Sequence, residues 1–344
     1  MHASSAAPSL FVACIGFPHV KSYVIMDFNE SINKNLTRTF NPYPDLKSYL
    51  SCGFVGPVVA NSCMGVIASY TRETPFEIRI SNPTTGKCAL MPDGKDSDDM
   101  MNNNIWNSLR QVVGIGYEPT EKQFKIVRIK WNNLKIIQPG EAVIEVYTIN
   151  NTENWRRVAS EGIFWVADFP AYMDGKIYFL VSCREYQFSE PNYLRIRAFN
   201  LQSEEFEEVQ LPLDADNNEV IIQDYSVTMG NLGQGIYLCR RVDADRVFEV
   251  WRFMDNNWSS MFNIPFFSPD RSCPRLFITP NRNGLYMVVF RRSTEFVTYN
   301  GIKIEGRFEL FARRHQRRSR FINYCSWVQH SPSLVFPAVG NVQR

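Results

Sequence analysis

The sequence predicts an all-β fold, and three observations lead to this prediction. Segments with the i, i+3, i+4, i+7 spacing of an amphipathic helix are scarce outside a short stretch at Met101–Arg110. Short apolar runs rich in Val, Ile, Tyr and Phe recur instead from Leu10 to Phe336. These runs also repeat at the spacing of four-stranded propeller blades. We therefore expect a β-propeller-like ring of about six antiparallel blades, with a β-sandwich pair as the alternative.

The first predicted strands lie near the N-terminus. The apolar stretch at Ala7–Phe17 has no Lys or Arg ahead of it and is far too short to span a membrane. Val20–Met26 follows, and the two stretches are typical of a β-hairpin. No linker-like segment divides the chain, so we expect a disordered N-terminus at 1–9, one domain at 10–337 and a disordered tail at 338–344.

The repeat is marked by a glycine that precedes an apolar strand in each predicted unit. Spacings of 51, 59, 60 and 49 residues separate these glycines, which are Gly65, Gly116, Gly175, Gly235 and Gly284. An alternating strand and a short outer strand follow each one, and three units close with an apolar residue and a proline, at Met91-Pro92, Leu211-Pro212 and Ile264-Pro265. One such unit cannot bury both faces of its sheet, so neighbouring units must stack. Phe321–Phe336 is expected to help close the ring.

Composition narrows the function classes. The formal net charge is +2, which gives no reason to expect a nucleic-acid partner. The eight cysteines form no C-x-x-C pair and are spread singly through apolar runs, as buried thiols in a reducing compartment are. We therefore expect a cytoplasmic or nuclear location, with no membrane association.

Motifs for catalysis or cofactor binding are absent from the sequence. The four histidines belong to no metalloprotease motif, and the sequence has no P-loop or nucleophile elbow. Gly114-Ile-Gly116 is followed by strand-like residues, not by a helix, and Asp93–Asp99 lacks the spacing of a calcium loop, so we interpret both as structural. The sequence predicts no catalytic residue, metal or cofactor.

Two sets of residues are candidates for contact with a partner. The basic run at Arg313–Arg320 suits an acidic or phosphorylated protein surface or an import signal, although a solvated loop is the alternative. Three tryptophans lie outside the repeat phase and are candidates for exposed loop contacts, whereas Trp155, Trp251 and Trp258 fit packing within the repeat. The predicted partner-binding residues are Arg313, Arg314, Arg317, Arg318, Trp106, Trp131 and Trp165.

Several segments, in order, resemble the associated domain of plant F-box proteins. VANSCMGVIA at Val59–Ala68 is similar to the family's GSCNGLLCL, and SNPTTGK at Ser81–Lys87 to WNPSTRE. VGIGYEP at Val113–Pro119 with FKIVR resembles GFGYDP…DYKVVR, and VYTI at Val146–Ile149 with NWRR resembles VYSL…SWR. Ile196–Leu211, EVW with Trp258, and Ser326–Val335 continue the series. The departures are Met64 in place of Asn, and Gly86-Lys87 in place of Arg-Glu.

The resemblance implies a function. It suggests the substrate-recognition module of an SCF-type E3 ubiquitin ligase, a non-enzymatic receptor that binds a target protein through propeller loops. A Skp-type adaptor and a cullin would be partners only if an F-box lies upstream, and we detect no F-box before Leu10. The alternatives are a truncated decoy or scaffold without ligase coupling, and a propeller enzyme acting on carbohydrate.

Overall fold

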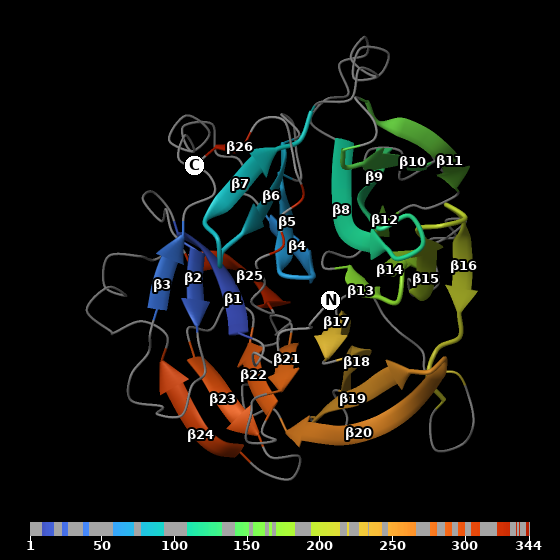
Figure 1. The fold of residues 1–344 in the computed structure, drawn as a ribbon. Coiled ribbons are helices and arrows are strands. Elements are labelled where there is room, and N and C mark those ends of the chain that lie inside the picture. The colour runs from blue at the N-terminus through green and yellow to red at the C-terminus, as the bar shows by residue number, and fades with distance from the viewer. Residues whose placement is uncertain are drawn as a thin grey trace. The chain divides into compact units, whose positions relative to one another are not determined.

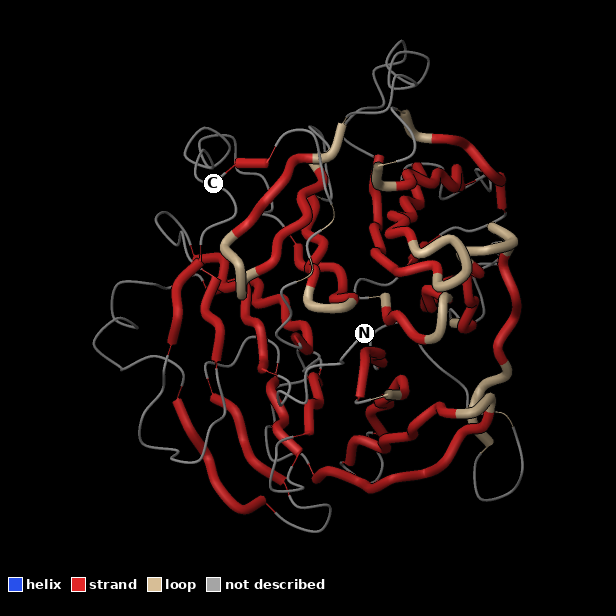
Figure 2. Tube along the Cα trace, viewed as in Figure 1, coloured by secondary structure: helices blue, strands red, loops and turns tan. Residues whose placement is uncertain are grey.

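The computed structural model describes twenty-three stretches of the chain. They are residues 9–16, 23–26, 37–40, 58–71, 77–92, 109–132, 142–150, 154–161, 165–166, 170–182, 194–213, 219, 227–232, 234–242, 247–265, 276–280, 286–290, 295–299, 304–309, 322–330, 335, 337 and 342–343. Every regular element in these stretches is a strand, as Figure 2 shows. The strands form six antiparallel sheets of four or five strands, divided between two compact units (Figure 1).

Unit 1 comprises Met1–Leu50 and Leu211–Pro332 and holds three four-stranded sheets. The first has the order β25-β1-β2-β3, with β1 (Ser9–Gly16), β2 (Tyr23–Met26), β3 (Thr37–Phe40) and β25 (Ile322–His330). The second runs through β17 (Val227–Leu232), β18 (Gly235–Val242), β19 (Val247–Met254) and β20 (Asn257–Pro265). The third runs through β21 (Leu276–Pro280), β22 (Tyr286–Phe290), β23 (Glu295–Tyr299) and β24 (Ile304–Glu309).

Unit 2 comprises Ser51–Gln210 and Ser333–Arg344 and also holds three sheets. The β4–β7 sheet consists of β4 (Val58–Cys63), β5 (Val66–Tyr70), β6 (Ile78–Asn82) and β7 (Lys87–Leu90), with β26 (Val342–Gln343) beside β7. The β8–β11 sheet consists of β8 (Leu109–Glu118), β9 (Gln123–Asn132), β10 (Ala142–Thr148) and β11 (Arg156–Glu161). The β13–β16 sheet consists of β12 (Trp165–Val166), β13 (Ala171–Met173), β14 (Lys176–Ser182), β15 (Arg195–Asn200) and β16 (Phe206–Val209).

The repeat predicted from the sequence corresponds to these sheets. The all-β class and about six sheets are confirmed, and the β-sandwich pair is wrong. β1 and β2 form the predicted N-terminal hairpin, with Leu10 opposite Met26. β25, from the predicted closing segment, pairs with β1 over most of its length. The tail expected to lack structure at 338–344 contributes β26, and β1 already begins at Ser9.

Tight turns explain why glycine recurs. Met64 and Gly65 join β4 to β5 with φ of 49° and 78°, and Asp174 and Gly175 join β13 to β14 with φ of 49° and 75°. Two-residue hairpin turns with positive φ at both positions favour glycine at the second. The repeat in the sequence predicts that Gly116 is also such a turn glycine, and this prediction is wrong. Gly116 lies inside β8, and the corresponding turn ends at Lys122, where φ is 57°.

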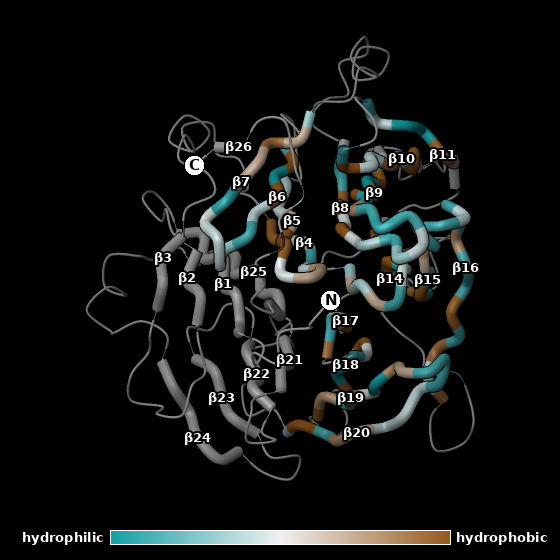
Figure 3. The backbone as a smooth tube through the Cα atoms, viewed as in Figure 1, coloured by the Kyte–Doolittle hydropathy of each residue, from teal (hydrophilic) through white to brown (hydrophobic). Residues whose placement is uncertain are grey.

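Apolar side chains fill the space between the sheets of unit 2. Middle strands are buried along both faces, as β5 is at all of its positions. Such strands read as continuous apolar runs. The outer strand β11 is hydrophilic along most of its length in Figure 3. The unit therefore has a core between stacked sheets and a polar periphery.

Candidate functional site

The sheets of unit 2 have two different ends. At the turn end, short turns join the first to the second strand and the third to the fourth, at Met64–Gly65, Pro119–Lys122, Asp174–Gly175, Pro83–Gly86 and Leu201–Ser203. At the loop end, residues 71–77, 133–141 and 183–194 join the second strand to the third. Longer connections on a rigid sheet framework carry most binding residues in proteins. The loop end is therefore the candidate binding surface.

Hydrogen bonds place the turns of neighbouring sheets together at the turn end. The Tyr172 hydroxyl donates to the Tyr117 carbonyl at 2.7 Å, which links β13 to β8. Lys125 Nζ donates to the Leu201 carbonyl at 2.7 Å, and the Leu201 N–H donates to the Gly175 carbonyl at 3.0 Å. The turns of the β8–β11 and β13–β16 sheets thus form one connected layer.

A side-chain amide joins the first strands of two sheets. Asn61 Nδ2 donates to the Ile115 carbonyl at 2.7 Å, and Asn61 Oδ1 accepts from the Ile115 N–H at 2.8 Å. Both residues are almost fully buried, so the amide of β4 stands in for a backbone peptide toward β8. Gln111 makes a second link at the loop end, where its Nε2 donates to the Thr71 carbonyl at 2.6 Å.

A close approach of the sheets explains the glycines of β8. A Cβ atom on Gly116 would lie 2.5 Å from Leu201 Cδ1 and 2.8 Å from Tyr172 Cδ2. A Cβ atom on Gly114 would lie 2.7 Å from Ile177 Cγ2. The two glycines allow β8 to pack directly on the next sheet. This agrees with the structural interpretation of Gly114-Ile-Gly116.

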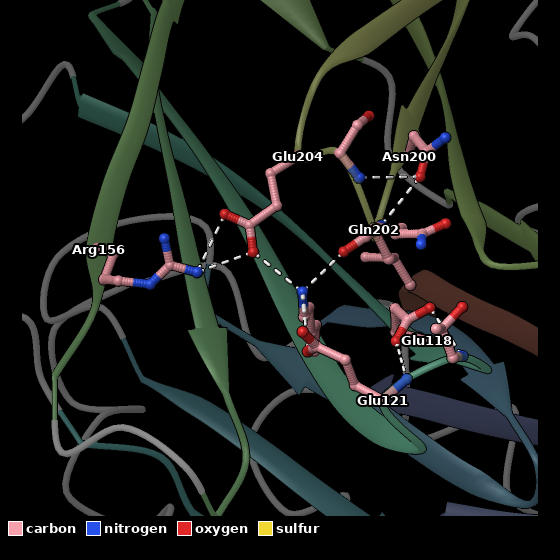
Figure 4. Close-up of polar contacts among 10 residues, drawn as sticks. Glu118, Glu121, Arg156, Asn200, Gln202 and Glu204 are labelled. Atoms are coloured by element: carbon pink, nitrogen blue, oxygen red, sulfur yellow. Dashed lines mark hydrogen bonds and ion pairs between the residues drawn. The ribbon is translucent and has the colours of Figure 1, made fainter.

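An ion cluster joins the β8–β11 and β13–β16 sheets at the turn end (Figure 4). Glu204, held at φ 59°, accepts from Lys125 Nζ at 3.0 Å and from Arg156 Nη2 at 2.7 Å. Burial acts to raise the pKa of the Glu204 carboxyl, but the hydrogen bonds from Arg156 and Lys125 outweigh it, so this pKa is lowered. Glu121 lies 3.8 Å from the same Lys125 ammonium. The cluster holds two sheets together by charge.

A second ion cluster lies nearer the loop end, inside the β8–β11 sheet. Arg128 Nε donates to Glu145 Oε2 at 2.7 Å, and Lys130 Nζ to Glu145 Oε1 at 3.0 Å. The Arg128 guanidinium also lies 4.0 Å from the centre of the Trp155 ring, a cation–π contact. Trp155 Nε1 donates to the Pro92 carbonyl at 2.7 Å. These contacts connect β9, β10 and Trp155, just before β11, to Pro92, just after β7.

The described carboxylates and thiols have structural partners or are buried. Within the described stretches, no group of three or more His, Cys, Asp or Glu side chains is placed to hold a metal ion. The two most buried ion-paired carboxylates, Glu145 and Glu204, each accept from two cations. Burial raises the pKa of the Cys63 and Cys239 thiols, so neither is activated. Among the residues that the structure describes, no helix is long and apolar enough to cross a membrane.

The predicted partner-binding residues have different outcomes. Arg313, Arg314, Arg317, Arg318 and Trp106 lie outside the described residues. Trp165 belongs to β12 and pairs with Ser182. Trp131 is not an exposed loop residue: it is 5% exposed inside β9, opposite Arg110 of β8. The reason is that β9 runs ten residues, beyond the point where the sequence repeat suggests an end.

One repeated ion pair was missed in the sequence, although a signal for it exists. An Arg–Glu pair occupies the same position in two sheets, Arg128 opposite Glu145 and Arg240 opposite Glu249. In both sheets the Glu begins a Glu-Val-aromatic run. Arg240 also donates to Glu249 through Nε and Nη2 and lies 5.5 Å from the Trp251 ring centre. The spacing within each pair differs because the connecting loops differ in length, which hides the repeat.

Comparison with known proteins gives sequence and structural relatives. F-box only protein 8 of Arabidopsis thaliana is 25% identical over 142 residues, which span 41% of this chain and 45% of that protein. The chain thus matches about half the length of this curated relative. TolB from Acinetobacter baumannii superposes with a TM-score of 0.48 at 11% identity, covering 94% of this chain and 66% of TolB. The β-propeller domain of the trilobed protease from Pyrococcus furiosus gives 0.40 at 10% identity, covering 88% and 94%.

A family model settles the classification. The model described as the F-box associated beta propeller domain matches residues 28–300, which is most of the chain. The matched range runs through all three sheets of unit 2 and most of unit 1. The chain belongs to the F-box associated beta propeller domain family.

Proposed function

We propose that this chain is the substrate-recognition module of an SCF-type E3 ubiquitin ligase. The observation that carries the proposal is the family match over residues 28–300. The similarity to an Arabidopsis F-box protein supports it. In this role a Skp-type adaptor and a cullin dock through an F-box, and the associated domain holds the target.

Recognition in this proposal is a matter of positioning. The target binds at the loop end of the sheets, where connections of different length and sequence give specificity. The buried ion pairs and the Asn61 amide keep the strands below those loops in place. Ubiquitin is then transferred by partner enzymes to a lysine of the held target. The role requires the cytoplasm or the nucleus, and the buried thiols of Cys63 and Cys239 agree with a reducing compartment.

Affinity purification tests target binding and its location. The full chain is compared with a variant in which residues 133–141 are replaced by a short Asn-Gly turn, and with the matched control Lys122→Glu at the exposed turn end. The proposal expects a defined set of bound proteins that is lost with the loop replacement and kept in the control. Equal binding sets in all three proteins, or loss only in the control, would remove the support for a loop-end site.

A second arm tests coupling to the ligase. The chain is expressed behind an F-box segment, and recruitment of a Skp-type adaptor and the ubiquitin load of the bound proteins are measured. The expected result is adaptor recruitment together with increased ubiquitination of the same set. If the adaptor joins but that set gains no ubiquitin, the receptor role is wrong and the decoy or scaffold alternative replaces it.

A further inference from the structure

The β4–β7 sheet carries a strand contributed by a distant part of the chain. β26 (Val342–Gln343) lies antiparallel beside the outer strand β7, with Val342 opposite Ala89 and Gln343 opposite Cys88. The pairing is two residues long, whereas β7 has four residues, Lys87–Leu90. The chain therefore places a very short strand of its own on this sheet edge.

A second contact holds the same segment. Asn82 Nδ2 donates to the Val335 carbonyl at 2.6 Å, across 253 residues of sequence. Asn82 is 0% exposed and its Oδ1 accepts from the Thr84 N–H at 2.8 Å, so its orientation is fixed by the turn that leads into β7. Pro337, between the two contacts, is buried. Val335 is thus attached to the β4–β7 sheet at its Asn82 turn, and Val342–Gln343 along β7.

The outer strands of unit 2 differ in how their edges are protected. β11 begins with Arg156 and Arg157, and β16 carries Glu207 and Glu208 at its centre. Charged residues on an edge strand discourage the addition of another strand. β7 has one charged residue at its start and continues as Cys88-Ala89-Leu90, with Leu90 40% exposed. Of these three edges, the one without adjacent charges is the one that pairs with a further strand among the described residues.

We propose that the outer edge of β7 is a strand-addition site, filled in cis by the segment at Val342–Gln343 and open in trans to an extended peptide segment of a partner. Main-chain hydrogen bonds provide the binding, as in β-augmentation generally, and the residue opposite Ala89 is a small or β-branched aliphatic one, like Val342. A partner strand that spans all of β7 forms a longer ladder than β26 does. The proposal does not depend on the ligase role, because it concerns only which strand pairs with β7.

The cis segment acts as a built-in competitor. A tethered strand reaches effective concentrations of about millimolar with a short flexible linker, so it raises the apparent Kd of any peptide added in trans. Weakening the cis strand therefore strengthens the binding of a peptide in trans.

The experiment uses the full chain and a fluorescent synthetic peptide with the sequence of residues 333–344, followed by anisotropy. Val342→Pro and Gln343→Pro are compared, because successive N–H groups of a strand point to opposite sides. Only one of the two prolines removes an N–H that faces β7, and the other is its matched control. We expect the variant that loses the N–H facing β7 to bind the peptide with an apparent Kd at least about tenfold lower than that of the unchanged chain. The control variant is expected to match the unchanged chain. Hydrogen exchange is expected to show faster exchange in β7 and its reversal by the peptide.

A locking variant provides the second arm. Gln343→Cys places a thiol opposite Cys88, and cross-strand neighbours are close enough for a disulfide. The oxidised chain is expected to lose peptide binding, and reduction to restore it. The proposal is overturned if neither proline variant binds the peptide while β5 and β6 keep their exchange protection. It is also overturned if both bind equally, if protection appears away from β7, or if the oxidised chain still binds.

Discussion

Removing the charge of Glu145 is expected to destabilise the β8–β11 sheet strongly. Glu145 is 1% exposed and accepts from Arg128 at 2.7 Å and from Lys130 at 3.0 Å. Glu145→Gln keeps the shape of the side chain but leaves two buried cations facing an uncharged amide. Removing one partner of a buried ion pair lowers stability by about 3–5 kcal/mol. The strand pairing and the Trp155 contact remain, so the sheet still forms.

The same Glu→Gln change at two more exposed Arg–Glu pairs shows how its cost should fall as exposure rises. In the β17–β20 sheet, the side chains of Arg240 and Glu249 are 21% and 25% exposed, and Glu249→Gln is expected to cost about 1.5–3 kcal/mol, as a hydrogen bond to a charged group does. Arg195 and Glu208 are 59% and 60% exposed, and Glu208→Gln is expected to cost under about 1 kcal/mol. Burial separates the two ends of this series, and Glu145 also has a second cationic partner in Lys130.

The measurement is hydrogen exchange at increasing urea, which gives a local opening free energy for each sheet. A single unfolding free energy is not defined when a chain has two compact units. Exchange is followed in peptides that cover β9 and β10, β18 and β19, and β15 and β16. At about 1 M salt the small loss in Glu208→Gln should vanish, while the loss in Glu145→Gln should persist. Equal losses in the three variants, or a larger loss at Glu208 than at Glu145, would refute the burial argument.

Three further outcomes are expected. Gly116→Ala should lower the local opening free energy of the β8–β11 sheet by about 1–3 kcal/mol in the same hydrogen-exchange measurement, since its Cβ meets Leu201 Cδ1 at 2.5 Å, and an unchanged opening free energy would contradict the close packing of β8. Asn61→Ala should cost about 2–4 kcal/mol in the same assay, because the buried N–H and C=O of Ile115 lose their partner, and Asn61→Asp, which restores only the acceptor, should not recover the full loss. Burial acts to raise the pKa of Glu118, but two backbone N–H groups of the following turn lower it below its usual value of 4.5, so this contribution to stability is present above about pH 4.5 and is lost as pH falls through the lowered pKa. Thermal melts from pH 7 to pH 3 should show a smaller acid loss in Glu118→Gln than in the unchanged chain.

The sequence predicts which segments form strands better than it predicts where each strand begins and ends. Glycine before an apolar run identified the turns at Gly65 and Gly175, where positive φ requires it. The same pattern at Gly116 has another cause, the approach of the next sheet to within 2.5 Å of its missing Cβ. A glycine needed for backbone conformation and one needed for packing look alike in one sequence, because the difference depends on a neighbour that is distant along the chain.

The buried charges could not be predicted from alternation. Arg128 and Lys130 alternate with apolar residues in the second half of β9, which normally indicates a strand with one face in water, and Lys125 lies on the other face of the strand. All three are nearly buried, and Glu145 of β10 and Glu204 of the β15–β16 connection pair with them. Which carboxylate meets which cation depends on the register across the 133–141 connection, and the length of that connection does not reveal it. Trp131 was misplaced for a related reason, since nothing in the repeat shows that β9 continues to Asn132.

The positions of these ion pairs affect how the binding surface can vary. Glu145, Arg128 and Lys130 all belong to paired strands, so their contacts survive a change in the 133–141 connection. The inner strands are joined in the same way, through the Asn61 amide and the backbone of Ile115. The described contacts that hold these strands together therefore come from residues within the sheets. Under the proposed receptor role, a change of target would come from substitutions in the connections between strands, which follow no repeat in the sequence.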